Sequence, residues 1–295
     1  LNNIFFLPFN FLFILFLIPK SFFLLKRKKI EKVFSTGGYM SLPVILGAKL
    51  LRIEVYLLEP NHVLGRANKF FLNTCVKIFC YTKKIKNFPK NLEHKIVEIN
   101  PLVREQIYKF KISDEIKEKY NLLIIGGSQG AKIFDNLKDL IIKISKEKQI
   151  KIFQQTSEQN ISSLSNFYSK NNIENEVFCF NKDFINIMQK ANICITRAGA
   201  SSLAELSVLN IPFIAVPLPT SKDNHQHENA NYYKKNNCCW IIEQNQLEKK
   251  IKDLLIDILE KRTDYIEKKN NLKKLNFQNS WNNVNQKILK NINEN

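Results

Sequence analysis

Several residue types that mark common protein classes are scarce in this chain. Its 295 residues include only 4 histidines, 8 glycines and 6 cysteines. The cysteines form no C-x-x-C pair and no spacing typical of a zinc site, so no metal centre is predicted. Cysteines such as Cys194 lie inside apolar runs, where a small buried thiol is expected. A reducing cytosol is therefore the simplest compartment.

Acidic residues are also few, because 27 Asp and Glu face 45 Lys and Arg and leave a net charge of +18. Such a balance favours anionic partners: nucleic acid, acidic lipid or phosphorylated substrates. A general bias toward lysine explains much of the excess equally well. Since no recognition helix and no basic strand interleaved with aromatic residues is present, nucleic acid is not the predicted partner.

Two glycine signatures are missing as well. The chain has neither G-x-G-x-x-G nor a Walker P-loop, which argues against a dehydrogenase or an ordinary ATPase. No internal repeat of fixed period is evident, and 295 residues are enough for two domains with separate cores. Because the first residue is Leu rather than Met, we expect the chain to begin inside a longer protein.

The longest apolar run covers residues 4–25 and is followed by four basic residues, 26–29. This pattern suggests a transmembrane helix, but Pro8, Asn10 and the trio at 19–21 interrupt it. We therefore expect one buried or interfacial helix and then a second short helix, whose basic end contacts anionic headgroups. The charge follows the apolar core, which is unlike a cleavable signal peptide.

Short apolar strands alternate with helices through most of the chain, which predicts an α/β fold with parallel sheets. A polar, charged stretch ending near Tyr120 interrupts the alternation. We accordingly predict a first domain over residues 1–103, a second over 104–278, and a C-terminal helix over 279–295 that packs back on the first domain.

Residues 180–229 indicate a strand, a glycine-containing turn, a helix, a second buried strand and a polar loop. This order places hydrogen-bonding groups at the carboxyl ends of parallel strands, where open α/β sheets bind nucleotides. The glycine loop at 126–130, between a buried strand and an amphipathic helix, offers unpaired backbone N–H groups to a phosphate. A simple turn in which Ser128 caps the helix is the alternative.

Three further sites allow two interpretations each. Ser202 and Glu205 fit the capping box S-x-x-E, yet a carboxylate near a strand end also accepts ribose hydroxyls. Arg197 is suited either to a diphosphate or to a surface ion pair. His225 and His227 flank Gln226, where hydrogen bonding is favoured over metal binding because no third ligand has a clear spacing.

In combination, these segments resemble the MurG family, the N-acetylglucosamine transferases that complete the bacterial cell-wall lipid precursor. The resemblance rests on motifs that occur in the family's order between residue 33 and about residue 242: Thr36-Gly37-Gly38-Tyr39, Glu59-x-Asn61 with Gly65-x-x-Asn68, Asn100-Pro101-x-x-Arg104, Gly126-Gly127-Ser128-Gln129-Gly130-Ala131, Arg197-x-Gly199-Ala200, Ala204-Glu205, and Asp223-Asn224-x-Gln226 followed by Asn229-Ala230.

The resemblance implies a GT-B fold, in which two Rossmann-like domains bind the lipid acceptor and the sugar nucleotide. Arg197 and the glycine loop would approach the donor diphosphate, Glu205 the ribose, and the backbone after Phe180 the uracil, while His225 and Gln226 would hold the sugar. The implied donor-binding residues are Ser128, Gln129, Gly130, Phe180, Asn181, Arg197, Glu205, His225 and Gln226. The implied acceptor or cleft residues are Gly37, Gly38, Asn61 and Arg104.

The implied reaction moves N-acetylglucosamine from UDP-N-acetylglucosamine to an undecaprenyl-diphosphate-linked N-acetylmuramoyl-pentapeptide, with inversion and without an obligatory metal or cofactor. The enzyme would act as a peripheral protein on the anionic cytoplasmic face of the bacterial plasma membrane. The alternative is a UDP-sugar-binding module that is inactive without a partner or a further N-terminal segment.

The chain departs from the family pattern at its start. The family opens with a glycine-rich loop whose histidine is assigned to acceptor binding or general base work, and residues 1–32 contain no match. The catalytic base is therefore left unassigned. Two smaller departures are Pro60, where the family usually has Gln, and Ser157, where glycine is common.

Overall fold

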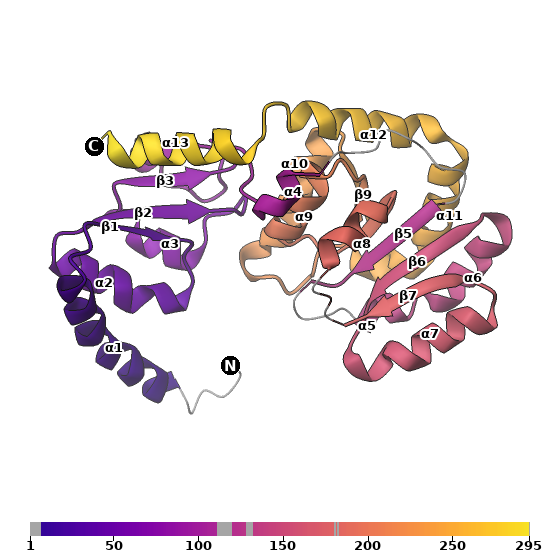
Figure 1. The fold of residues 1–295 in the computed structure, drawn as a ribbon, viewed down its shortest axis with the longest axis horizontal. Helices are drawn as coiled ribbons and strands as arrows, with labels where there is room; N and C mark the ends of the chain where they lie inside the picture. The colour runs from indigo at the N-terminus through magenta and orange to yellow at the C-terminus, as the bar shows by residue number, and fades with distance from the viewer. Residues whose placement is uncertain (1–6, 111–119, 128–131, 180, 182, 295) are drawn as a thin grey trace. The chain divides into compact units, whose positions relative to one another are not determined.

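A computed structural model of the chain describes residues 7–110, 120–127, 132–179, 181 and 183–294 (Figure 1). The chain divides into two compact units. Unit 1 contains Leu1–Asn100 and Asn285–Asn295, and unit 2 contains Pro101–Val284. Each unit is built around its own parallel β-sheet, which is the arrangement predicted for an α/β chain with two cores.

Unit 1 is a four-stranded parallel sheet with the strand order β1-β2-β3-β4. Its buried centre is β2, whose Val55, Tyr56 and Leu57 are at most 1% exposed. A strand that is covered on both faces has a continuous apolar run in its sequence. The elements of this unit are α1 (Leu7–Arg27), β1 (Lys32–Ser35), α2 (Leu42–Leu50), β2 (Glu54–Glu59), α3 (Arg66–Phe71), β3 (Lys77–Cys80) and β4 (Ile96–Glu98).

The N-terminal apolar segment differs from its prediction, because α1 is one continuous helix and not a buried or interfacial helix followed by a second short one. Pro8 is the second residue of this helix. Backbone N–H groups of the first turn have no partner within the helix, so the N–H that proline lacks costs no hydrogen bond there. Pro19 lies inside the helix without ending it. Helix α2 packs closely against α1 at Gly47, where an added Cβ would lie 3.0 Å from the Phe22 backbone nitrogen.

The last helix, α13 (Trp281–Asn293), ends in unit 1. The Ile292 carbonyl accepts hydrogen bonds from the Lys32 ammonium and, at 3.2 Å, from the Tyr56 hydroxyl. Lys77 Nζ donates to the Asn291 carbonyl at 3.3 Å. Two cations therefore meet the negative end of the helix dipole, which fixes the end of α13 in this unit.

Unit 2 is a six-stranded parallel sheet with the strand order β10-β9-β8-β5-β6-β7. The first strand of the unit, β5, pairs with β6 on one side and with β8 on the other. Strands β6 and β7 therefore extend the sheet on one side of β5, and strands β8, β9 and β10 extend it on the other. This order is that of a dinucleotide-binding fold. The strands are β5 (Tyr120–Ile125), β6 (Ile150–Gln155), β7 (Glu174–Phe178), β8 (Ile193–Thr196), β9 (Phe213–Ala215) and β10 (Cys239–Ile241).

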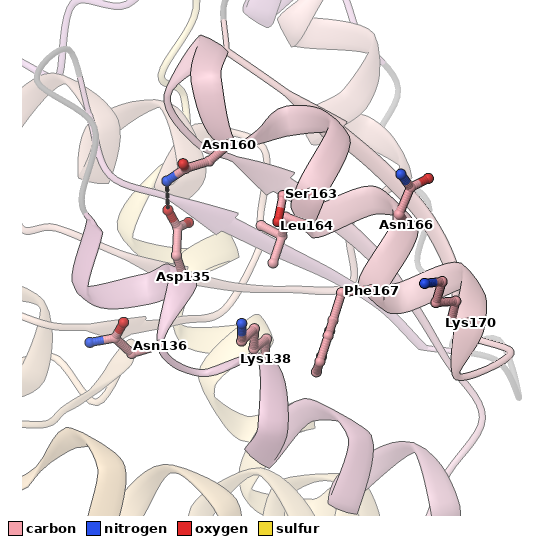
Figure 2. A pocket seen from close by; sticks show the side chains of 9 residues that line it. All are labelled: Asp135, Asn136, Lys138, Asn160, Ser163, Leu164, Asn166, Phe167 and Lys170. Atoms are coloured by element: carbon pink, nitrogen blue, oxygen red, sulfur yellow. Dashed lines mark hydrogen bonds between the residues drawn. The ribbon is translucent and has the colours of Figure 1, made fainter.

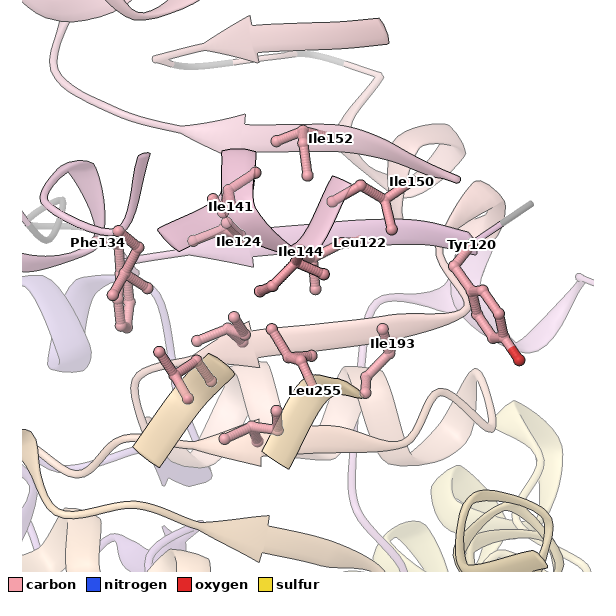
Figure 3. Close-up of a cluster of buried hydrophobic side chains, with 14 of the residues drawn as sticks. Tyr120, Leu122, Ile124, Phe134, Ile141, Ile144, Ile150, Ile152, Ile193 and Leu255 are labelled. Atoms are coloured by element: carbon pink, nitrogen blue, oxygen red, sulfur yellow. The ribbon is translucent and has the colours of Figure 1, made fainter. Parts of the chain in front are cut away.

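The helices of unit 2 cover the sheet and supply much of its core (Figure 3). Apolar side chains of β5, such as Leu122 and Ile124, pack with Ile141 and Ile144 of α6 and Leu255 of α11 in one buried cluster. The helices are α4 (Glu105–Tyr108), α5 (Lys132–Asp135), α6 (Lys138–Glu147), α7 (Ile161–Lys170), α8 (Phe184–Lys190), α9 (Ala200–Val208), α10 (His225–Lys235), α11 (Leu247–Glu260) and α12 (Arg262–Leu275).

Candidate functional site

The carboxyl ends of β5, β8 and β9 lie side by side in unit 2. Thr196 of β8 pairs with Ile125 of β5 on one side and with Ala215 of β9 on the other. The loops that follow these strands are therefore neighbours at the point where the strand order reverses. Open α/β sheets bind their ligands at this point, so this edge is the candidate site.

The glycine loop begins at this edge. The Gly126 N–H donates to Gln155 Oε1 at 3.2 Å, and Gly127 adopts φ = 77°, a left-handed conformation suited to glycine. The predicted donor residues Ser128, Gln129, Gly130 and Phe180 lie outside the described residues. Their proximity to a phosphate or a uracil stays a prediction.

Arg197, directly after β8, is held by protein acceptors. Its Nη1 donates to the Val216 carbonyl at 3.2 Å and its Nη2 donates to Gln244 Oε1 at 2.7 Å. The guanidinium also lies over the ring of Phe134, 5.4 Å from its centroid. Partial burial lowers the pKa of Arg197 from its usual value. In this arrangement Arg197 braces the loops after β8, β9 and β10 against one another.

The capping-box interpretation of Glu205 is wrong. Helix α9 begins at Ala200 with Gly199 as its N-cap, so Ser202 already lies within the first turn, and the cap makes no side-chain hydrogen bond. The helix begins earlier than the S-x-x-E pattern suggests. Glu205 is therefore available for other contacts near the carboxyl end of β8.

Its actual partner is Arg104, which the sequence resemblance placed with the acceptor residues. Arg104 belongs to unit 2 and precedes α4. Its Nε donates to Glu205 Oε1 at 2.8 Å and its Nη2 donates to Glu205 Oε2 at 2.9 Å, which makes a bidentate pair. The side chain of Glu205 is 14% exposed and that of Arg104 is 46% exposed.

The polar loop predicted at the end of residues 180–229 instead enters helix α10 at His225. Asp223 and Asn224 adopt φ values of 53° and 56°, and this left-handed turn precedes the helix. Gln226 Oε1 accepts the Leu218 N–H at 3.0 Å, and Asn229 Nδ2 donates to the Ala198 carbonyl at 3.2 Å. Helix α10 thereby holds the loops after β8 and β9.

The two histidines of α10 differ in their hydrogen bonds. His225 Nδ1 lies 2.7 Å from the Lys222 carbonyl, which can only accept, so Nδ1 carries the proton and Nε2 is an acceptor when the ring is neutral. His227 Nε2 instead lies 3.3 Å from Glu243 Oε1. Among the described residues, no group of three or more His, Cys, Asp or Glu side chains could hold a metal ion.

Asn181 lies just before α8, where its Oδ1 accepts the Asp183 N–H at 2.7 Å. A separate cavity of about 480 Å³ is lined by residues of α5, α6 and α7 and contains none of the predicted site residues. Figure 2 shows Asp135 at its rim, bonded to Asn160 at 3.0 Å. Asp135 also accepts from Gln154 and Thr156, so this carboxylate serves to join α5 to β6 and α7.

In unit 1, sequence reasoning missed the central role of Glu59. This carboxylate is 2% exposed, and its Oε1 accepts the Asn61 N–H at 3.1 Å and Asn61 Nδ2 at 3.0 Å. Its Oε2 accepts the Gly65 N–H at 2.7 Å and Asn68 Nδ2 at 2.9 Å. The Glu59-x-Asn61 spacing was the available signal, because it permits a local side-chain turn.

Gly37 and Gly38 follow β1 with φ values of 79° and 85°. A Cβ on Gly37 would lie 2.7 Å from Asn68 Oδ1, so the glycine allows the turn to approach the Glu59 network. Gly37, Gly38 and Asn61 thus follow the carboxyl ends of the adjacent parallel strands β1 and β2 in unit 1.

Comparison with known families covers most of the chain. The profile of the glycosyltransferase family 28 C-terminal domain matches residues 121–284, and that of the family 28 N-terminal domain matches residues 5–80. The first match lies in unit 2 and includes both the glycine loop and helix α10.

Curated relatives resemble the chain along its length. A UDP-N-acetylglucosamine–N-acetylmuramyl-(pentapeptide) pyrophosphoryl-undecaprenol N-acetylglucosamine transferase of Pelagibacter ubique is 49% identical over all of this chain and 83% of the relative. A protein of the same name from a Wolbachia of Brugia malayi is 34% identical over 91% of this chain and 78% of its own.

Solved structures confirm the predicted fold class. MurG of Acinetobacter baumannii superposes with a TM-score of 0.74 at 26% identity, covering 98% of this chain and 81% of that one. A UDP-N-acetylglucosamine 2-epimerase of Neisseria meningitidis superposes with a TM-score of 0.66 at 13% identity over 95% and 80%, which shows likeness of fold alone. The chain, a GT-B protein of two parallel α/β units, therefore belongs to the MurG family of N-acetylglucosamine transferases.

Proposed function

We propose that the chain transfers N-acetylglucosamine from UDP-N-acetylglucosamine to an undecaprenyl-diphosphate-linked N-acetylmuramoyl-pentapeptide in peptidoglycan synthesis. The observation that carries the proposal is the 49% identity over the whole chain with a relative named for this reaction. The reaction is an inverting displacement at the anomeric carbon, in which a hydroxyl of the acceptor attacks and UDP leaves.

In the proposed donor site, the carboxylate of Glu205 accepts the ribose hydroxyls at the carboxyl edge of the sheet. His225 and Gln226, on the first turn of α10, hold the sugar. Because Gln226 Oε1 already accepts the Leu218 N–H, its amide NH₂ is the group proposed to face the ligand as a donor. His225 complements it, since its Nε2 is an acceptor when neutral.

The diphosphate is proposed to lie against the glycine loop. Backbone N–H groups there would stabilise the negative charge that develops on the departing UDP. The contacts of Arg197 with the loops after β9 and β10 favour a supporting role, in which it holds the edge of the site in shape. The scheme uses no bound metal.

The acceptor is proposed to bind unit 1 near the Gly37-Gly38 turn and Asn61. Both features lie at the carboxyl ends of adjacent parallel strands, β1 and β2. The network around Glu59 supports this proposal, because it fixes the orientation of the Asn61 side chain. The general base is not assigned.

A peripheral position on the anionic cytoplasmic face of the plasma membrane is also proposed. Helix α1 exposes large apolar side chains and ends in Lys26 and Arg27, a combination suited to an interface rich in acidic lipid. Among the described helices, none combines the length and the hydropathy that crossing a bilayer would require.

UDP release in the presence of UDP-N-acetylglucosamine tests the proposed activity. We expect release to depend on a lipid-linked muropeptide acceptor and to fall at least about tenfold at low donor concentration in Glu205→Gln, because the variant weakens ribose binding. Donor binding without acceptor-dependent release would identify a UDP-sugar-binding module instead.

A further inference from the structure

We propose that Gln155 is a positioning residue for the donor: its side-chain amide fixes the spacing between the loop that meets the diphosphate and the segment that meets the uracil. Gln155 is the last residue of β6, the strand that lies between β5 and β7. The inference rests on the proposed donor site, in which the glycine loop faces the diphosphate and the segment after β7 faces the base.

The Gln155 amide joins the ends of three neighbouring strands. Its Oε1 accepts the Gly126 N–H at 3.2 Å, directly after β5. Its Nε2 donates to the Cys179 carbonyl at 3.2 Å, directly after β7. Because a side-chain amide has an acceptor at one atom and donors at the other, one glutamine can hold both backbone groups at once.

These two hydrogen bonds lie where the strand ladders end. The last pair between β5 and β6 joins Ile124 to Gln154, and the last pair between β6 and β7 joins Gln155 to Phe178. Beyond these pairs the glycine loop and the segment after β7 leave the sheet, and the Gln155 amide links them. It therefore sets how far apart the two halves of the proposed site lie.

The far end of the glycine loop is anchored separately. Asp135, in the helix that follows the loop, accepts from the Thr156 hydroxyl at 2.8 Å and from Gln154 Nε2 at 3.0 Å. The same strand end thus holds the chain on both sides of the loop. Loss of the Gln155 amide leaves the contacts of Asp135 in place, so it should change the spacing of the two halves more than it changes either half.

Ligands of different length separate positioning from a general structural role. UDP spans both halves of the proposed site, so its affinity depends on how well their spacing is fixed in advance. Uridine and inorganic pyrophosphate each reach one half, so their affinities do not depend on that spacing. A substitution that merely loosens the fold would weaken all three ligands alike.

Gln155→Met keeps the length of the side chain and removes both hydrogen bonds. We expect it to weaken UDP binding about tenfold, and binding of uridine or pyrophosphate by less than about twofold. Gln155→Asn keeps the amide but is one methylene shorter, so it cannot span both neighbours and should give the same pattern. NMR titration of the whole chain measures the three dissociation constants.

Steady-state kinetics should show the same selectivity. KM for UDP-N-acetylglucosamine is expected to rise about tenfold in Gln155→Met while kcat stays within about twofold, because the lost contribution acts on the bound donor before and during the reaction alike. A fall in kcat with an unchanged KM would overturn the positioning role.

Gln159→Met is the matched control, because it makes the same substitution at an exposed glutamine shortly after β6. Its affinities for all three ligands should equal those of the parent protein. Unchanged UDP binding in Gln155→Met overturns the inference, and so does an equal loss for UDP, uridine and pyrophosphate.

Failure of the proposed donor site gives a different result. If the parent protein binds UDP no more tightly than uridine, the diphosphate does not meet the glycine loop, and the inference falls with the site. If the parent prefers UDP and Gln155→Met keeps both that preference and the parent affinity, the site stands and only the positioning role of Gln155 is overturned.

Discussion

Glu59 shows how a single buried carboxylate organises a loop of unit 1. Four N–H donors from Asn61, Gly65 and Asn68 converge on its two oxygens. Because two N–H donors bind each oxygen, this side chain is suited to holding the loop in place. In the proposed acceptor site, Glu59 would act indirectly, through the orientation of Asn61.

Glu59→Gln tests this role. Whichever way the new amide turns, its NH₂ group faces two N–H donors, which should cost about 2–3 kcal/mol of local stability. We expect backbone hydrogen exchange in β2 and α3, measured by mass spectrometry, to accelerate about thirtyfold, the factor that corresponds to 2 kcal/mol.

Glu93→Gln provides the control for that experiment, because Glu93 is an exposed carboxylate of the same unit. It should leave exchange in β2 and α3 unchanged. Exchange rates in Glu59→Gln that match those of Glu93→Gln would show that the four hydrogen bonds do not stabilise the loop.

Sequence reasoning identified individual residues better than it identified their contacts. Glu205 was found from its position after a strand, but its partner Arg104 lies 101 residues away along the chain, and no local pattern links them. The capping box misled because the same four letters fit either the first residue of a helix or its interior. Only the start of α9 at Ala200 separates the two cases.

At the scale of elements, two glycine N-caps that look alike in sequence have different surroundings. Gly65 before α3 and Gly199 before α9 both have ordinary extended φ and ψ angles. A Cβ on Gly65 would lie 2.9 Å from Glu59 Oε2, whereas a Cβ on Gly199 would meet nothing closer than 4.0 Å. The close approach of the Glu59 carboxylate therefore requires glycine at position 65, whereas no neighbouring group requires it at position 199.

Unequal effects of alanine at these caps are expected. Gly65→Ala should destabilise unit 1 by about 1–3 kcal/mol, because it crowds the buried carboxylate. Gly199→Ala should change the stability of unit 2 by less than about 1 kcal/mol, because alanine restricts the unfolded chain but is a poorer N-cap than glycine. Hydrogen exchange of α3 and α9 reports each unit separately. Equal effects at the two positions would contradict the geometry.

Helix α1 presents an exposed apolar surface that includes Phe16 at 59% and Phe23 at 67%. If this surface enters the membrane interface, Phe16→Ser with Phe23→Ser should weaken binding to vesicles containing phosphatidylglycerol at least about tenfold, because two aromatic side chains lose their burial. Binding should also weaken with salt, as expected for the basic end of α1.

The matched control is Phe277→Ser, which removes an aromatic side chain that is 75% exposed on unit 2. Vesicle binding should be unaffected by it. Equal loss from the control and the double variant, or equal binding to vesicles of neutral lipid, would argue against α1 as the membrane contact. Sedimentation with the vesicles measures both.

The strands were the elements best predicted from sequence, because buried parallel strands appear as short continuous apolar runs. Two helices were harder to predict. The prolines of α1 suggested breaks, yet Pro8 lies in the first turn and Pro19 is accommodated within the helix. Helix α10 carries mainly polar residues, so the sequence predicts a loop where its first turn lies.

At the scale of the whole molecule, alternating strands and helices were enough to predict two parallel α/β units. The strand order was not readable, because the place of β8 beside β5 depends on contacts between segments about 70 residues apart. That order creates the sheet edge where Arg197, Glu205 and α10 gather. The resemblance to the MurG family supplied the function, and the 49% identity with a curated relative supports it.

Identification of the reaction product tests the proposed transfer reaction. With UDP-N-acetylglucosamine and an undecaprenyl-diphosphate-linked N-acetylmuramoyl-pentapeptide, we expect a lipid-linked disaccharide whose mass exceeds that of the acceptor by one N-acetylhexosamine residue. Inversion of the α-linked donor predicts a β-glycosidic bond, which proton NMR of the released disaccharide shows. An unchanged acceptor after complete binding of the donor, or a product with an α-linkage, would show that the chain does not catalyse the inverting transfer.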